Sequence, residues 1–350
     1  MHDLRVEVRE RSRDLLVIPA RRRVVDRREF LAGAAALPVA LAYGGPHALA
    51  ARLGGVTPLA LVTADLESHV VALDLASTAT VKRMRTAPGP RAVESVHGTR
   101  AVVAHTEHGV VTLLDALQLE ILAELGGLEE PRYAAVHPAR PIAYVTDSAR
   151  QEVVAIDAER ARIVGRAHVP GPTRHISISG DGRTIWTALG TAAARVAVLE
   201  ASDPRRPKLV RTISPPFLAH DVVFAPDGAV WVTSGDERRI VLYRGGRPVR
   251  ILPADAPPQH VAFSLRKAFV ASGDDGTLRR HRLDGELVRE ARVPYGSYNV
   301  AFGSGGVITP SLSRGTATFL DRNGRIRAAR HVARAAHDAC IVVSTWRRDR

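Results

Sequence analysis

Cysteine, lysine and aromatic residues are scarce in this chain of 350 residues, and each shortage excludes a class of protein. Cys340 is the only cysteine, so no disulfide stabilises the fold and no Cys-x-x-Cys site is present. Only three of the 49 basic residues are lysine, and aromatic residues make up 5% of the chain. The net charge of +13 attracts anions, but the arginines are scattered along the chain and match no nucleic-acid-binding motif. We therefore expect no nucleic-acid partner.

The chain also lacks a long apolar run. The stretch from Leu31 to Tyr43 holds thirteen residues and includes Pro38, whereas a membrane-spanning helix needs ~20 apolar residues. It follows Asp26–Leu31, which contains Arg27-Arg28, and this arrangement resembles a twin-arginine signal. We expect residues 1–50 to be a signal peptide and disordered leader. The resemblance implies export to the periplasm or the extracellular space, with no membrane span in the mature form.

One pattern of about forty residues recurs seven times between Pro58 and Val343. The clearest copy holds four short β-type runs, at 141–147, 153–157, 161–164 and 172–178, and each is too short for a helix. Asp181-Gly182 and Asp227-Gly228 supply the tight turns that follow such runs. Four strands per copy indicate a propeller blade. The sequence predicts an all-β, seven-bladed β-propeller over 58–344, with four antiparallel strands per blade and a disordered tail at 345–350.

The two ends of the repeat region are expected to complete one blade together. The run from Leu59 to Thr63 corresponds to the second strand of a blade, and the run from Asp338 to Val343 corresponds to the missing innermost strand. Pairing these two runs closes the ring and removes an open sheet edge. Cys340 then lies in an innermost strand, where a thiol packs as a small apolar group. The insertion Asp203–Pro207 is predicted to be a solvated loop in an outer hairpin.

The repeat resembles the YVTN-type seven-bladed propeller family. Tyr144-Val145-Thr146-Asp147 and Ser179-Gly180-Asp181-Gly182-Arg183 carry the likeness, which extends over most of the repeat region. The Trp-Asp dipeptide of the WD type is absent. The resemblance implies a scaffold shared by binding proteins, lactonases and metal carriers, so it predicts the fold and leaves the function open.

Chemistry is expected where the chain enters the innermost strands, because these entries gather at one mouth of the central channel. Candidate metal ligands, suited to a divalent ion such as zinc, are His175, His220, Asp221, His260, His337 and Asp338. Candidate ligand-binding residues are Arg91, Arg132, Tyr133, Arg174, Tyr298 and Asn299. The alternative interpretation is that these polar groups bind neighbouring loop backbone and channel water.

Three functions fit this arrangement. The first is an exported, monomeric propeller that binds a small molecule, a divalent metal or an envelope protein at the mouth without catalysis. The second is a metal-assisted lactonase or lyase that uses the same mouth. The third is a platform for another envelope protein, with no small-molecule site. No Gly-x-Ser-x-Gly, His-Glu-x-x-His or glycine-rich phosphate loop is present, and no catalytic residue is assigned.

Overall fold

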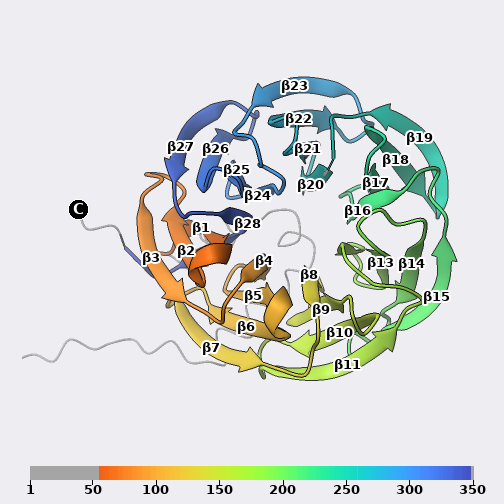
Figure 1. Ribbon diagram of the computed structural model, residues 1–350, viewed down its shortest axis with the longest axis horizontal. Helices are drawn as coiled ribbons and strands as arrows, with labels where there is room; N and C mark the ends of the chain where they lie inside the picture. The colour runs from red at the N-terminus through yellow and green to blue at the C-terminus, as the bar shows by residue number, and fades with distance from the viewer. Residues whose placement is uncertain (1–54, 258, 348–350) are drawn as a thin grey trace, which may run out of the picture. The chain divides into compact units, whose positions relative to one another are not determined.

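Seven four-stranded antiparallel sheets surround one central channel (Figure 1). A computed structural model describes residues 55–257 and 259–347. The prediction of an all-β, seven-bladed propeller is confirmed. Within these residues there are two short 3-10 helices, and no helix is long and apolar enough to cross a membrane. The predicted signal peptide and the last three residues of the predicted tail lie outside the described residues.

The blades are numbered along the chain, and the strands of each are given from the channel outward. Blade 1 consists of β28 (Ala336–Ser344), β1 (Thr57–Ala64), β2 (His69–Asp74) and β3 (Thr80–Arg85). Blade 2 consists of β4 (Pro90–Val96), β5 (Arg100–His105), β6 (Val110–Asp115) and β7 (Glu120–Leu125). Blade 3 consists of β8 (Pro131–Val136), β9 (Ile142–Asp147), β10 (Glu152–Asp157) and β11 (Arg162–His168). Blade 4 consists of β12 (Ile176–Ile178), β13 (Thr184–Ala188), β14 (Val196–Glu200) and β15 (Lys208–Ile213).

The remaining blades follow the same order. Blade 5 consists of β16 (Ala219–Phe224), β17 (Val230–Ser234), β18 (Arg239–Arg244) and β19 (Arg247–Pro253). Blade 6 consists of β20 (Gln259–Ser264), β21 (Lys267–Ser272), β22 (Thr277–Arg282) and β23 (Leu287–Arg292). Blade 7 consists of β24 (Ala301–Gly303), β25 (Gly306–Ser311), β26 (Thr316–Asp321) and β27 (Ile326–His331). The 3-10 helices η1 (Asp65–Glu67) and η2 (Thr106–His108) occupy the turns between the second and third strands of blades 1 and 2.

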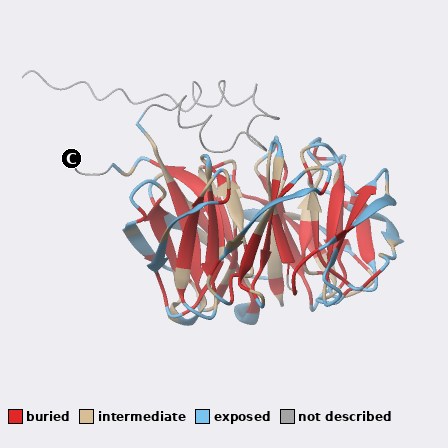
Figure 2. Ribbon diagram, turned by 90° about the horizontal axis from the view of Figure 1, so that it is seen from above, coloured by how far each residue is buried: buried red, intermediate tan, exposed pale blue. Residues whose placement is uncertain are grey.

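Apolar side chains pack between neighbouring blades. Leu61 of blade 1 and Val103 of blade 2 belong to one core cluster, and Tyr144 of blade 3 and Leu199 of blade 4 belong to another. Each of the seven interfaces between blades has a cluster of this kind. The middle strands are therefore buried on both faces, whereas the outermost strands are largely exposed (Figure 2). Because each core joins two blades, the ring positions all seven inner strands around the channel.

The ring closes between the two ends of the described chain. β1 pairs with β28 in antiparallel register, with Leu59 opposite Val342 and Leu61 opposite Cys340. This pairing confirms the predicted closure of the ring. Cys340 is buried in the core between blades 1 and 2, as predicted for an innermost strand.

Bulges recur where the chain enters the inner strands. In blades 1, 3 and 5 the register shifts at this point, so that two residues of the inner strand lie opposite one threonine of the second strand. The hydroxyls of Thr63, Thr146 and Thr233 accept hydrogen bonds of 2.9–3.0 Å from the bulged backbone N–H groups. A bulge re-aims the side chains next to it. These blades therefore present two polar side chains each at the same mouth of the channel.

The insertion Asp203–Pro207 lies between β14 and β15 and contacts the neighbouring blade 3. Its Pro204 carbonyl accepts a hydrogen bond of 2.9 Å from the Tyr144 hydroxyl. The backbone of Arg205 lies directly over Gly165, where an added Cβ would be only 1.8 Å from the Arg205 carbonyl oxygen. The loop is largely exposed to solvent, as predicted, and it also connects blade 4 to blade 3 through these contacts.

Gly165→Ala is expected to destabilise the protein by ~1–3 kcal/mol, because the loop backbone must move away from the new methyl group. Urea unfolding of the variant measures the change. Gly126→Ala is the matched control, since its Cβ would meet open space, and we expect a change within ~0.5 kcal/mol. Equal stabilities of the two variants would show that the backbone of Arg205 moves away from the methyl group without loss of stability.

Candidate metal centre at the channel mouth

Each blade offers two adjacent positions at the mouth, at the start of its inner strand or just before it, which we name the entry ring and the channel ring. The entry ring consists of Arg91, Arg132, Arg174, His220, Gln259, Tyr298 and His337. The channel ring consists of Ala92, Tyr133, His175, Asp221, His260, Asn299 and Asp338. Residues that are about forty positions apart in sequence therefore meet around one axis.

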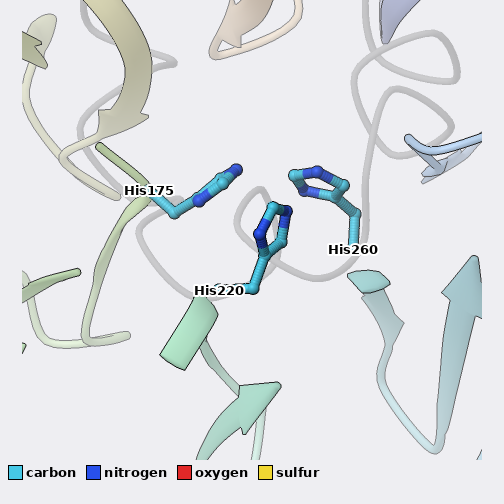
Figure 3. A group of neighbouring side chains, drawn as sticks. All are labelled: His175, His220 and His260. Carbon is cyan, nitrogen blue, oxygen red and sulfur yellow. The ribbon is translucent and has the colours of Figure 1, made fainter. Parts of the chain in front are cut away.

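Three histidines from blades 4, 5 and 6 converge at this mouth (Figure 3). His175, His220 and His260 each offer a ring nitrogen, and these nitrogens all lie within 4.8 Å of one another. The ring centroid of His175 lies 4.5 Å from that of His220 and 4.6 Å from that of His260. All three side chains are buried. We name this group the histidine cluster.

Two neighbouring oxygens orient the rings of the cluster. The Nδ1 atom of His220 lies 3.1 Å from the carbonyl oxygen of Thr191, so it donates a proton there and leaves Nε2 free. The Nδ1 atom of His260 lies 3.4 Å from Oδ2 of Asp221. Metal-binding histidines are commonly held in this way, with a carbonyl or carboxylate on the nitrogen that does not bind the metal.

His175 has no comparable partner. Among the described residues, neither of its ring nitrogens forms a hydrogen bond of regular geometry, and Nε2 of His220 is also unpaired. Buried polar atoms without partners are rare and costly, and an unseen ion is one common explanation. An unpaired nitrogen on each of two facing rings, His175 and His220, points to a ligand that the two rings share.

Burial keeps the imidazoles of His175 and His220 neutral. It lowers the pKa of His175 well below the usual value, and the nearby His220, His260 and Arg174 lower it further. The pKa of His220 falls to about 3, mainly through burial and secondarily through His260. Neutral imidazole is the form that binds metal ions. His175 and His220 are thus in their metal-binding protonation state at neutral pH.

The spacing of the cluster requires a small closure around an ion. Three nitrogens at ~2.0 to 2.1 Å from a tetrahedral zinc ion lie about 3.4 Å apart, whereas those of the cluster lie within 4.8 Å. Three protein ligands leave one position of a tetrahedral site open.

A cavity of about 410 Å³ occupies the channel next to the cluster. It is lined by His175, His260, Asp221 and Tyr133, among others. The ring centroid of Tyr133 lies 4.1 Å from that of His175, so the phenol ring covers one side of the cluster. The cavity therefore borders two of the three histidines, His175 and His260.

His337 and Asp338, also predicted as metal ligands, lie apart from the histidine cluster. His337 is buried, and its Nδ1 atom lies 2.8 Å from Oδ2 of Asp65, with which it forms a pair. Asp338 accepts hydrogen bonds of 3.0 Å from the backbone N–H of Val93 and of 2.8 Å from that of Ala339. Burial raises the pKa of Asp338. Its carboxyl group therefore links blades 1 and 2, as the alternative interpretation of the polar entries expects.

Asp221 has a similar linking role. Its carboxylate accepts hydrogen bonds from Val222 N–H at 2.8 Å and from Val261 N–H of the next blade at 3.4 Å. It also faces His260, so it joins the frame of the channel to the histidine cluster. We assign it to orientation of His260 in preference to direct metal binding.

Tyr298 and Asn299, predicted as ligand-binding residues, have internal partners. The Tyr298 hydroxyl donates a hydrogen bond of 2.9 Å to Asp274 on the adjacent turn. The side-chain amide of Asn299 donates one of 2.9 Å to the carbonyl of His337. Asn299 lines the cavity, whereas Tyr298 does not.

The three predicted arginines lie on blades 2, 3 and 4 at the same entry-ring position. Arg91 lies 3.8 Å from Asp65, and Arg132 forms an ion pair with Glu130. Arg174 bonds to the hydroxyl of Thr191, and its guanidinium carbon lies 6.0 Å from the ring centroid of Tyr133. These arginines therefore place a cationic side of the mouth next to the histidine cluster.

Comparison with solved structures finds the same fold in several proteins. AztD of Citrobacter koseri matches with a TM-score of 0.65 and 11% identity, over 82% of this chain and 98% of that chain. A functionally unknown protein from Desulfotomaculum acetoxidans matches with a TM-score of 0.67 and 12% identity, over 81% and 98%. Hydrazine synthase of Kuenenia stuttgartiensis matches with a TM-score of 0.62 and 17% identity, over 72% and 89%.

These likenesses show the fold alone, because the identities are low. No protein-family model matches the chain, and no curated protein does. The function must therefore be argued from the site itself.

Glu94 is a candidate site residue that the sequence prediction did not include. It lines the same cavity, two positions further into its strand than Ala92 of the channel ring. Burial, with the nearby Asp338, raises the pKa of Glu94 to about 8. The signal in the sequence is an acidic residue that directly follows the apolar Ala92 and Val93 in an inner strand.

Glu94→Gln is expected to change the pH dependence of stability. The folded protein keeps the Glu94 proton up to about pH 8, whereas the unfolded chain loses it near pH 4.5. The stabilising effect of this proton is complete below pH 4.5 and is lost as the pH rises to about 8, by up to ~1.4 kcal/mol per pH unit. The neutral glutamine removes this slope. The stability of the variant relative to that of the wild type therefore increases from pH 5 to pH 8.

Urea unfolding at several pH values measures this effect. Glu120→Gln, on an exposed outer strand, is the control and should follow the wild type at every pH. Parallel stability curves for Glu94→Gln and the wild type would contradict a raised pKa at Glu94.

Proposed function

We propose that this protein binds one divalent metal ion of the zinc class at the channel mouth, through His175, His220 and His260. One observation carries the proposal: three buried imidazoles from three successive blades face one another, and three of their nitrogens have no hydrogen-bond partner in the described part of the chain. Neutral nitrogen ligands suit zinc and its neighbours among the transition metals.

The protein is proposed to hold the ion without turning over a substrate. Holding a metal needs only its ligands, their orienting partners and a route to solvent. The Thr191 carbonyl and the Asp221 carboxylate are suited to orient the ligands. The cavity beside the cluster offers the route. The bound ion would keep one position for water or for an exchanging ligand.

Metal titration of untagged protein tests the proposal. The metal-free protein, prepared with a chelator, is titrated with Zn²⁺ and with Co²⁺. We expect one ion per chain, a higher unfolding temperature in its presence, and visible Co²⁺ bands of a tetrahedral nitrogen-bound site. Protein that takes up neither ion would refute the proposal.

A metal-assisted lactonase or lyase is the second candidate, and Glu94 favours it. A carboxyl group with a pKa of about 8 in the same cavity could transfer a proton at neutral pH. The zinc-loaded protein should then open lactones, and Glu94→Gln should abolish this activity without loss of the metal. Absence of turnover in the loaded wild type would leave metal holding as the function.

Export and family membership complete the proposal. Arg27-Arg28 and the following apolar stretch support twin-arginine export to the periplasm, which cell fractionation checks. The repeat signature at Tyr144–Asp147 supports a YVTN-type origin for the confirmed propeller. Because the twin-arginine route carries folded proteins, this export would imply that the ring closes, and loads any metal, in the cytoplasm.

A further inference from the structure

Arg91, Arg132 and Arg174 form a second feature of the mouth, which we name the arginine arc. They occupy the entry ring of three successive blades, and the last of them directly precedes His175 of the histidine cluster. The Nε atoms of all three are buried and have no hydrogen-bond partner among the described residues. Each of these buried, unpaired donors needs an acceptor, because burying a polar group without a partner is costly.

The three guanidinium groups act on common neighbours. Burial lowers the pKa of Arg132, Glu130 counteracts this, and Arg174 and Arg91 lower it further. Arg174 and Arg91 also both act on Tyr133, whose pKa burial raises. Cations that lie close enough to lower the pKa of a neighbouring cation repel one another, and a bound anion reduces this repulsion.

Arg174 is the member best placed to bind an anion. Arg91 is near Asp65 and Arg132 is paired with Glu130, but Arg174 has no carboxylate partner within the part of the chain that the structure describes. It lies by the ring of Tyr133, and that ring covers His175. A guanidinium presents a planar set of donors that matches carboxylate and phosphate oxygens.

We infer that the mouth binds a small oxyanion, a carboxylate or a phosphate, between the arginine arc and the metal held by the histidine cluster. This inference rests on the proposed metal site for one of its two anchors. One anion oxygen would take the position that three histidines leave open, and the others would accept hydrogen bonds from Arg174 and its neighbours. The protein would then bind a metal together with an anionic small molecule.

Inorganic phosphate is the probe that tests this inference. Phosphate is added to protein loaded with one Co²⁺, and the visible Co²⁺ bands report its binding to the metal. Calorimetry with metal-free protein reports binding to the arginine arc alone. We expect Arg174→Gln to weaken phosphate binding to the loaded protein at least ~10-fold. Arg195→Gln, which removes an exposed arginine from a turn at the same mouth, should bind as the wild type does.

The two arms separate failure of this inference from failure of the metal site. If Co²⁺ binds but phosphate changes nothing, or if Arg174→Gln binds phosphate as well as the wild type, the inference is overturned while the metal site stands. If Co²⁺ does not bind, the metal proposal fails. If, in that case, the metal-free wild type binds phosphate and Arg174→Gln does not, the arginine arc remains as an anion site. If the metal-free wild type does not bind phosphate either, both the metal site and the anion site are refuted.

Discussion

His175→Ala is expected to lower the affinity for zinc or cobalt at least ~100-fold, because it removes one of three ligands and leaves His220 and His260 as the only imidazoles of the site. The metal-free variant should be as stable as the wild type or more so. The reason is that burying an imidazole without hydrogen-bond partners is costly, and the alanine does not bury one. Competition with a chelator measures the affinity, and urea unfolding measures the stability.

His337→Ala is the matched control for this prediction. His337 is a buried histidine at the same mouth, but it is paired with Asp65 and lies outside the histidine cluster. We expect its replacement to leave the metal affinity within a few-fold of the wild type and to reduce stability through loss of the pair. Equal losses of affinity in both variants would show that the metal site extends further around the ring than the three histidines.

The fold was predictable because its signal is repeated. Each blade repeats short β runs and tight turns at the same spacing, so one ambiguous copy is supported by the six others. The Asp181-Gly182 turn shows how local chemistry agrees with the period: Gly182 has a positive φ of 75°, and an added Cβ would meet His137 Nε2 at 2.4 Å. The closing pair of β1 and β28 followed from the same count of strands.

The site was predictable only in part. The sequence aligned the histidines at equivalent strand entries, and the structure brings His175, His220 and His260 together. The sequence could not show that His337 pairs with Asp65, because this pairing depends on the conformation of η1, the turn between β1 and β2 that carries Asp65. His220 reaches the cluster from the entry ring and not from the channel ring. Such differences of one position depend on the bulges, whose side-chain directions are not encoded in the alternation of residues.

Electrostatic environment was also beyond the sequence. Glu94 and the arginine arc matter because of their burial and their neighbours, which come from other blades. Glu94 and the three arginines, about forty residues apart, were visible in the sequence. Which groups they approach depends on distances across the channel, and the packing of all seven blades sets these distances.

Removal of β28 is expected to abolish cooperative folding. A chain that ends at Arg334 lacks the strand that pairs with β1 along its whole length. The same strand supplies Cys340 and Val342 to the core between blades 1 and 2, and Ile341 to the core between blades 7 and 1. Its loss would expose both cores and an unpaired edge of β1, which favours aggregation. Circular dichroism and size-exclusion chromatography would show an expanded or aggregated chain without a sharp unfolding transition.

A chain that ends at Arg347 is the control, because it keeps every described strand and should unfold as the full chain does. A peptide of residues 335–347, added to the shortened chain, should restore folding by adding the missing strand to β1. If the ring must close before blades 4, 5 and 6 hold their histidines in place, restoration would also return the histidine cluster. A shortened chain that unfolds with the midpoint of the full chain would instead mean that each blade is stable without closure, and that the histidine cluster forms from its own three blades alone.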